Sequence, residues 1–138
     1  MPPLEPMKPK SMLTIMSLLS VVLMSIHVTD DIVRGISRAG ADNIGAVVIF
    51  VVWLVGTLML AERRSGHVIM LIGGIFAAAM PVLHMRGVRY PTIAASSGGF
   101  FFVWILVAVG VTGTMSVILS AHGLWALRSS KLRERREE

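Results

Sequence analysis

The sequence predicts an all-α protein built as an up-down bundle of four transmembrane helices, with both termini in the cytoplasm. Three observations lead to this fold class. Hydrophobic residues make up 54% of the 138 residues and the mean hydropathy is +0.75, which is more apolar than an ordinary soluble domain. Four apolar windows are long enough to cross a bilayer. The lysines and arginines are concentrated in segments that would lie on one side of it.

The four windows follow from the length that a bilayer requires, about 20 mostly apolar residues for a hydrocarbon core about 30 Å thick. Lys, Arg, Asp and Glu are absent from 11–29, 43–61, 65–85 and 90–127. We therefore expect helices over approximately 11–34, 43–62, 66–86 and 97–127. The residues after the first apolar core offer no A-x-A-like cleavage site, so this helix is expected to be retained rather than removed as a signal peptide.

The distribution of positive charge predicts the orientation and the division of the chain. Nine of the 13 lysines and arginines lie in the N-terminal segment, the "ERRSG" turn and the C-terminal tail, against four on the other side. Because cytoplasmic loops carry the excess of positive charge, both termini are expected in the cytoplasm. The chain then comprises a cytoplasmic N-terminal segment (1–10), a transmembrane domain (11–127) and a basic cytoplasmic tail (128–138).

Small residues on the third and fourth helices predict protein contacts. Thr112, Ser116 and Ser120 recur every four residues, and Gly73 with Ala77 marks a similar face. Small side chains let helices approach closely in lipid. Basic residues that follow an apolar run commonly contact lipid headgroups. The expected partners are the lipid bilayer and either further copies of the chain or a larger membrane complex, with no nucleic acid.

A polar cluster follows the first apolar run, in the stretch "SIHVTDDIVRG". His27, Asp30, Asp31 and Arg34 lie within about 100° of arc on one helix face, at about 100° per residue. Counting about 20 residues along the third helix from the "ERRSG" turn brings a second histidine to the same depth. That residue is His84, and Arg86 follows just beyond it.

Two interpretations of this cluster remain open. In the first, Arg34 forms a helix-end ion pair with Asp30 or Asp31, and His27 bonds a neighbouring backbone group. In the second, His27, Asp31 and His84 converge as metal ligands or as a proton-exchange site, because an i, i+4 histidine and carboxylate can share one ligand. Asp30, Arg34 and Arg86 would then complete the polar surroundings.

Other function classes have less support. Cysteine is absent, which excludes disulfides, thiolate metal sites and cysteine nucleophiles. His67 and His122 lie near the opposite boundary and allow a single-haem membrane cytochrome as a minor alternative. No phosphate-binding loop, nucleophile elbow or dinucleotide fingerprint is present. We therefore expect a protein that is not an enzyme and requires no cofactor, with a divalent cation as a possible ligand.

Four stretches carry a resemblance over nearly the whole chain: "HVTDDIVRG", "VVWLVGTLMLAERRSG", "PVLHMRG" and "SSGGFFFVWILVAVGVTG". Together they resemble small bacterial four-helix inner-membrane proteins to which no activity is assigned. The resemblance implies a bacterial inner-membrane location and transfers no functional residue.

The leading functional prediction is a small integral membrane protein that binds or passes a small solute, proton or cation at an outward-facing His/Asp site. The alternative is an accessory or assembly subunit of a larger membrane complex. Transport needs a continuous polar path, whereas the middle of the third helix is almost entirely apolar. Binding at one end of the bundle is therefore favoured over conduction through it.

Overall fold

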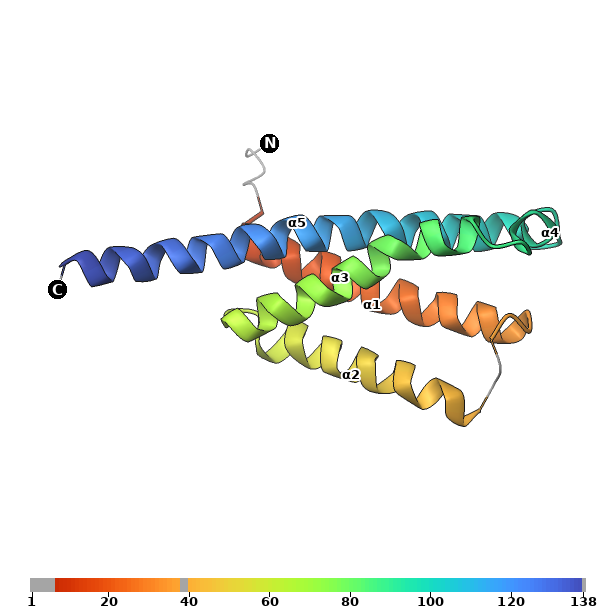
Figure 1. Cartoon of the computed structure of the whole chain (residues 1–138), viewed down its shortest axis with the longest axis horizontal. Helices are drawn as coiled ribbons and strands as arrows, with labels where there is room; N and C mark the ends of the chain where they lie inside the picture. Colours follow the sequence, from red (N-terminus) through yellow and green to blue (C-terminus); the bar gives the residue numbers. More distant parts are fainter. Residues whose placement is uncertain (1–6, 38–39, 138) are drawn as a thin grey trace, which may run out of the picture.

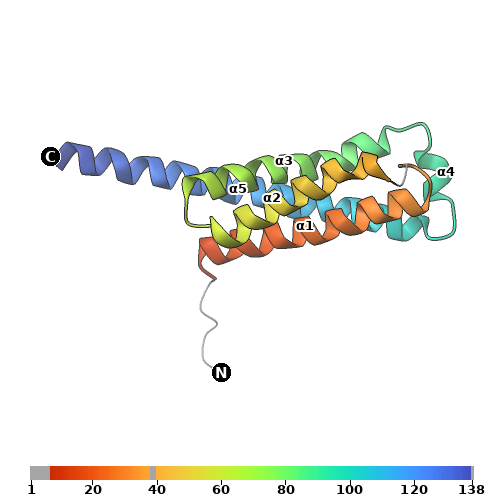
Figure 2. The same cartoon turned by 90° about the horizontal axis from the view of Figure 1, so that it is seen from below.

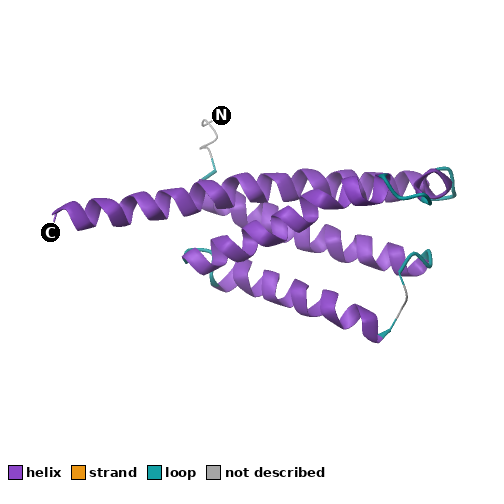
Figure 3. Ribbon diagram, in the orientation of Figure 1, coloured by secondary structure: helices purple, strands orange, loops and turns teal. Residues whose placement is uncertain are grey.

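The structure is a computed structural model that describes residues 7–37 and 40–137. All of its regular elements in these residues are helical (Figure 3). In chain order the elements are α1 (Pro9–Val33), η1 (Ala41–Asn43), α2 (Ile44–Met59), α3 (Arg64–Met85), α4 (Tyr90–Ala94) and α5 (Gly99–Glu137).

Three of the helices, α1, α3 and α5, are long and apolar enough to cross a membrane. The chain is therefore a multi-pass membrane protein with helical spans. The fourth apolar helix, α2, has 16 residues, which corresponds to about 24 Å at 1.5 Å per residue. It ends earlier than the expected 43–62 helix. The turn to α3 is tight and requires glycine at position 66, since a Cβ there would collide with the carbonyl of Leu60.

The C-terminal tail is a continuation of α5, which is 39 residues long and passes residue 127 without a break. The expected separate tail is therefore helical. Its Arg, Lys, Leu and Glu residues are good helix formers, which accounts for the continuation. Figure 1 shows this end of α5 extending beyond the other helices.

The closest packing joins α3 to α5. A Cβ on Gly113 would lie 2.6 Å from the backbone nitrogen of Ala78, and a Cβ on Gly110 would lie 2.6 Å from Cγ of Pro81. Ser116 and Ser120 are fully buried, and the Ser116 hydroxyl donates to the Met70 carbonyl at 3.4 Å. The prediction that this small-residue face packs against protein is confirmed, and the protein it contacts is the chain's own α3.

The helix α2 lies at one edge of the assembly (Figures 1 and 2) and is held there by a buried polar network. Trp53 Nε1 donates to Ser17 Oγ at 2.9 Å, and Thr57 Oγ1 donates to the Trp53 carbonyl at 2.9 Å. The Ser17 and Thr57 hydroxyls are 2.7 Å apart. Since the Thr57 hydrogen is already used, Ser17 donates to Thr57, and these side-chain groups are all paired.

Candidate functional site

The predicted polar cluster assembles at the end of the molecule that carries α4. His27 and Asp31 lie one turn apart on α1, and His84 lies near the end of α3. Asp31 Oδ2 is 3.2 Å from Nε2 of His84 and 3.6 Å from Nε2 of His27. Ligand atoms of these three residues all lie within 4.8 Å of one another.

The cluster faces protein. His27 is 1% exposed and Asp31 is 8% exposed. The two imidazole rings meet edge to face, with centroids 4.6 Å apart. The buried ring of Phe102 from α5 lies 6.0 Å and 6.2 Å from the two histidine centroids. A carboxylate in this place is shielded from hydrocarbon, as its cost of burial in a membrane requires.

The hydrogen bonding of His84 leaves two acceptors facing each other. His84 Nδ1 lies 3.1 Å from the carbonyl oxygen of Met80, which only accepts, so Nδ1 carries the hydrogen. In the neutral ring Nε2 is then an acceptor, and it faces the carboxylate of Asp31 at 3.2 Å. This contact therefore requires a positive charge, either a proton on one of the two groups or a cation shared by them.

Other atoms of the cluster lack partners. Both ring nitrogens of His27 and Oδ1 of Asp31 are buried without a hydrogen bond in the described part of the chain. An unpaired buried donor or acceptor typically costs about 1–3 kcal/mol. The arrangement therefore suits a ligand that several of these atoms can contact together.

Two imidazoles and one carboxylate are suitable ligands for a transition-metal ion. Nitrogen and carboxylate ligands bind zinc at about 2.0–2.2 Å, so two ligands of one tetrahedral ion lie roughly 3.4 Å apart. The separations of 3.2 and 3.6 Å around Asp31 Oδ2 are close to this value. The bond from His84 Nδ1 to a backbone carbonyl fixes the ring so that Nε2 is directed inward, as in many metal-bound histidines.

Asp30 and Arg34 form a separate structural pair. Arg34 Nε donates to Asp30 Oδ2 at 2.7 Å, and its terminal nitrogens donate to the Gly98 carbonyl and the Ser96 hydroxyl. The ion pair of the first interpretation is thus present, and it ties α1 to the segment before α5. Arg86 is exposed, and in the described residues it forms no ion pair or hydrogen bond with the cluster. The first interpretation therefore holds for the ion pair, but it is wrong for His27, whose ring nitrogens bond no backbone group in the described residues.

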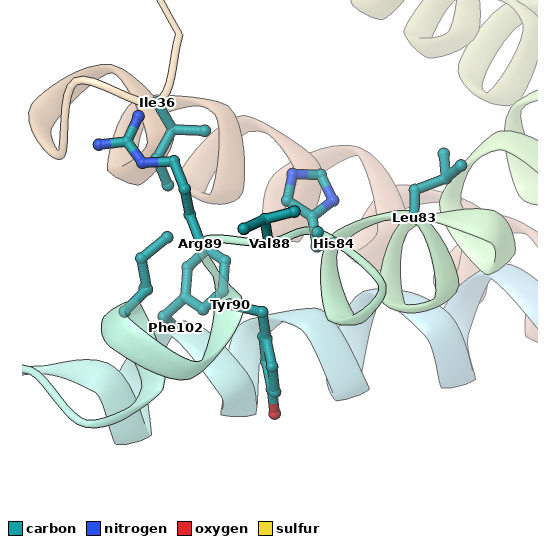
Figure 4. Close-up of a pocket in the computed structure, with 9 residues that line it drawn as sticks. Ile36, Leu83, His84, Val88, Arg89, Tyr90 and Phe102 are labelled. Carbon is teal, nitrogen blue, oxygen red and sulfur yellow. The ribbon is translucent and has the colours of Figure 1, made fainter.

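A cavity of about 270 Å³ reaches His84 from the α4 end. Its walls are mainly apolar and include Leu83, Val88 and Phe102. Figure 4 shows the guanidinium of Arg89 and the hydroxyl of Tyr90 at opposite edges, both directed away from the His84 ring. A small ligand or a water molecule in this cavity could therefore approach the cluster through His84.

Of the other two histidines, His67 is more buried than expected. His67, expected at the interface, is 5% exposed, and its ring packs against Gly123 of α5. Its Nδ1 donates to the Arg63 carbonyl at 3.1 Å. His122, expected near the same boundary, is exposed beside Trp125. The close packing of α3 on α5 buries one histidine and leaves the other outside.

This geometry does not favour haem. The rings of His27 and His84 are too close for a porphyrin to lie between them, with a centroid separation of 4.6 Å. His67 is buried against Gly123 whereas His122 is exposed, so these two rings do not form a ligand pair either. The cluster thus suits a small cation or a proton.

Comparison with protein families, curated proteins and solved structures finds no match for this chain. The fold and site define a multi-pass helical membrane protein with a buried His/Asp cluster at one end. The functional inference therefore depends on the geometry of that cluster.

Proposed function

We propose that this protein binds a divalent transition-metal cation at His27, Asp31 and His84. The observation that carries the proposal is the facing of His84 Nε2 and Asp31 Oδ2, together with the unpaired nitrogens of His27. A proton on His84 or Asp31 would satisfy only one contact. A metal ion would contact Nε2 of both histidines and the carboxylate at once, and it would balance the buried negative charge.

The proposed setting is a bacterial inner membrane, crossed four times with both termini in the cytoplasm. Two features support the four crossings and the orientation. The lysines and arginines are divided nine to four between the two sides, as the positive-inside rule requires. The helices α1, α2, α3 and α5 lie side by side and alternate in direction (Figures 1 and 2). In this orientation the metal site opens to the outer face.

The proposed activity is binding at one end rather than conduction through the helices. Between the cluster and the opposite end, the core contains large apolar side chains with almost no exposure, including Met70, Leu106 and Val109. The buried hydroxyls of Ser17 and Thr57 are committed to each other and to Trp53. These residues provide no continuous polar path.

The alternative role, an accessory subunit, relied on small-residue faces as partner surfaces. Ser116, Ser120 and Gly74 are instead buried between α3 and α5 of the same chain. This observation removes the feature that favoured the alternative. Association with further copies stays a prediction to be measured by oligomer size in detergent.

Isothermal titration of the purified protein with Zn(II), Mn(II) and Ni(II) tests the proposal. Wild type should bind Zn(II) stoichiometrically, and His27→Ala and His84→Ala should each abolish binding while the protein stays folded. His122→Ala is the matched control, because this histidine is exposed at the opposite end, and it should bind normally. Absence of binding by wild type would refute the proposal.

A further inference from the structure

A second cavity lies on the other side of His27, between α1, α2 and α3. Its volume is about 170 Å³. The lining includes the thioethers of Met24 and Met80, the imidazole of His27 and the rings of Phe50 and Phe76. The other lining side chains are aliphatic, and no carboxylate of the described residues borders the cavity. Its chemistry is therefore softer than that of the His27–Asp31–His84 site.

The two methionines lie on the same two helices as the two histidines, and each shares a helix face with one of them. Met24 precedes His27 by three residues on α1, and Met80 precedes His84 by four residues on α3. Residues three and four apart share a helix face. Each methionine therefore lies one turn deeper in the molecule than the histidine on the same helix. Met24 is 0% and Met80 is 8% exposed, so both side chains are directed into protein.

His27 borders both sites. Its Nε2 lies 3.6 Å from Asp31 Oδ2, and its other ring nitrogen, Nδ1, is also buried without a hydrogen-bond partner. In a neutral imidazole one nitrogen carries the hydrogen and only the other has a lone pair, so His27 can coordinate at either site but not at both at once. When Nε2 carries the hydrogen and faces Asp31, Nδ1 has the lone pair that is available to the deeper cavity.

We propose that Met24, Met80 and His27 form a soft site for Cu(I), one helical turn below the His27–Asp31–His84 site. Thioether sulfur selects Cu(I), whereas carboxylate and water ligands suit harder ions. The site has neutral ligands in an apolar cavity. Because the desolvation cost of an ion rises steeply with its charge, a monovalent ion is favoured there over a divalent one.

This inference goes beyond the proposed function and shares one residue with it, since both sites use His27. It adds the identity of a second ion and two ligands outside the first cluster. The ion binds and leaves as Cu(I), so no electron transfer by the protein is involved.

Competition for Cu(I) against bathocuproine disulfonate, without oxygen and with ascorbate present, tests the soft site. Met24→Leu and Met80→Leu should each weaken Cu(I) binding by about tenfold or more. Both substitutions nearly conserve volume, which cores tolerate well. Met70→Leu is the matched control, because Met70 is equally buried on α3 but does not border the cavity. It should leave Cu(I) affinity unchanged.

Zn(II) titration of the same variants separates the two proposals. If Met24→Leu and Met80→Leu bind Cu(I) as tightly as Met70→Leu does, the soft site is refuted, even if Zn(II) still binds. If wild type binds Cu(I) in a methionine-dependent way but never binds Zn(II), the proposed function falls and the soft site stands.

A measurement on the unchanged sequence guards against variants that fail to fold. X-ray absorption at the copper edge should show sulfur ligands in Cu(I)-loaded protein, and selenomethionine labelling should convert them to selenium. A copper shell of nitrogen and oxygen alone would overturn the inference.

Discussion

Two buried polar clusters on the inner face of α1 differ in whether their hydrogen-bonding groups all have partners. Toward the N-terminal end, Ser17 joins Trp53 and Thr57 in a network in which each donor has an acceptor. Toward the α4 end, His27, Asp31 and His84 present more acceptors than donors. Fully paired polar groups stabilise a core. Surplus acceptors that converge within a few ångströms instead indicate a ligand or proton site, whereas a single unpaired hydroxyl such as that of Ser120 does not.

The largest effect on stability should come from the network of Ser17, Trp53 and Thr57, in which every donor is paired. Trp53 is 1% exposed, and its ring lies against Gly73. Trp53→Ala should lower the free energy of unfolding by about 3–5 kcal/mol, measured by denaturation in mixed micelles. Trp104→Ala is the control, because Trp104 is 59% exposed and its loss should change stability little. Equal effects would mean that the Trp53 network does not stabilise the fold.

Removing one acceptor at the α4 end should weaken metal binding without destabilising the fold. In Asp31→Asn the side-chain amide can donate to His84 Nε2, which resolves the conflict between two acceptors. Zn(II) affinity should fall about 100-fold. The stability of the metal-free protein should stay within about 1 kcal/mol of wild type or rise. Strong destabilisation of the metal-free variant, with Zn(II) binding retained, would mean that Asp31 has a structural role and is not a metal ligand.

Acid should weaken the α4-end site and leave the paired network intact. Histidine coordinates a metal only in its neutral form. Zn(II) affinity should therefore fall by about tenfold or more between pH 7.5 and pH 5.5, a range that includes the ordinary imidazole value near 6.5. Titrations at several pH values measure this loss. An affinity that is constant over the range would argue against imidazole ligands.

A smaller change is expected from a single hydroxyl of the paired network. Ser17→Ala leaves Trp53 Nε1 without its acceptor, and its expected cost is about 1 kcal/mol. Ser25→Ala is the matched control, since the Ser25 hydroxyl donates only to the Val21 carbonyl of its own helix. Unfolding curves of the two variants should differ. If they coincide, the contact between α1 and α2 contributes no net stability.

The smallest effect should come from the ion pair beside the site. Arg34→Ala removes the bonds to Asp30 and to the Gly98 carbonyl, and should cost about 0.5–1 kcal/mol. Zn(II) affinity should be unchanged, because Arg34 belongs to the structural pair. Arg86→Ala, at an exposed arginine, provides the reference. Loss of Zn(II) binding in Arg34→Ala alone would show that the pair supports the site.

The sequence predicted the helical class and the residues of the cluster for simple reasons. Apolar windows show the spans, and the i, i+4 spacing places His27 and Asp31 on one face. Counting residues across the membrane brings His84 to the same depth. These arguments need only the rise and turn of a helix.

Details that depend on how helices rotate against each other were not predicted. The pairing of Trp53 with Ser17 and the bond of His84 to the Met80 carbonyl depend on side-chain rotamers and helix contacts. The same limit explains His67, which the close approach of Gly123 buries. The sequence does not single out the methionines beside the histidines either, because their spacing alone does not distinguish packing from ligation.

X-ray absorption of the Zn(II)-loaded protein tests the central claim most directly. The spectrum should show two imidazole ligands and at least one oxygen ligand at about 2.0–2.2 Å. The His27→Ala protein should lose this signature, and the His122→Ala protein should retain it. A zinc shell without imidazole scattering, or no zinc retained after exchange into metal-free buffer, would contradict the assignment of His27, Asp31 and His84 as a metal site.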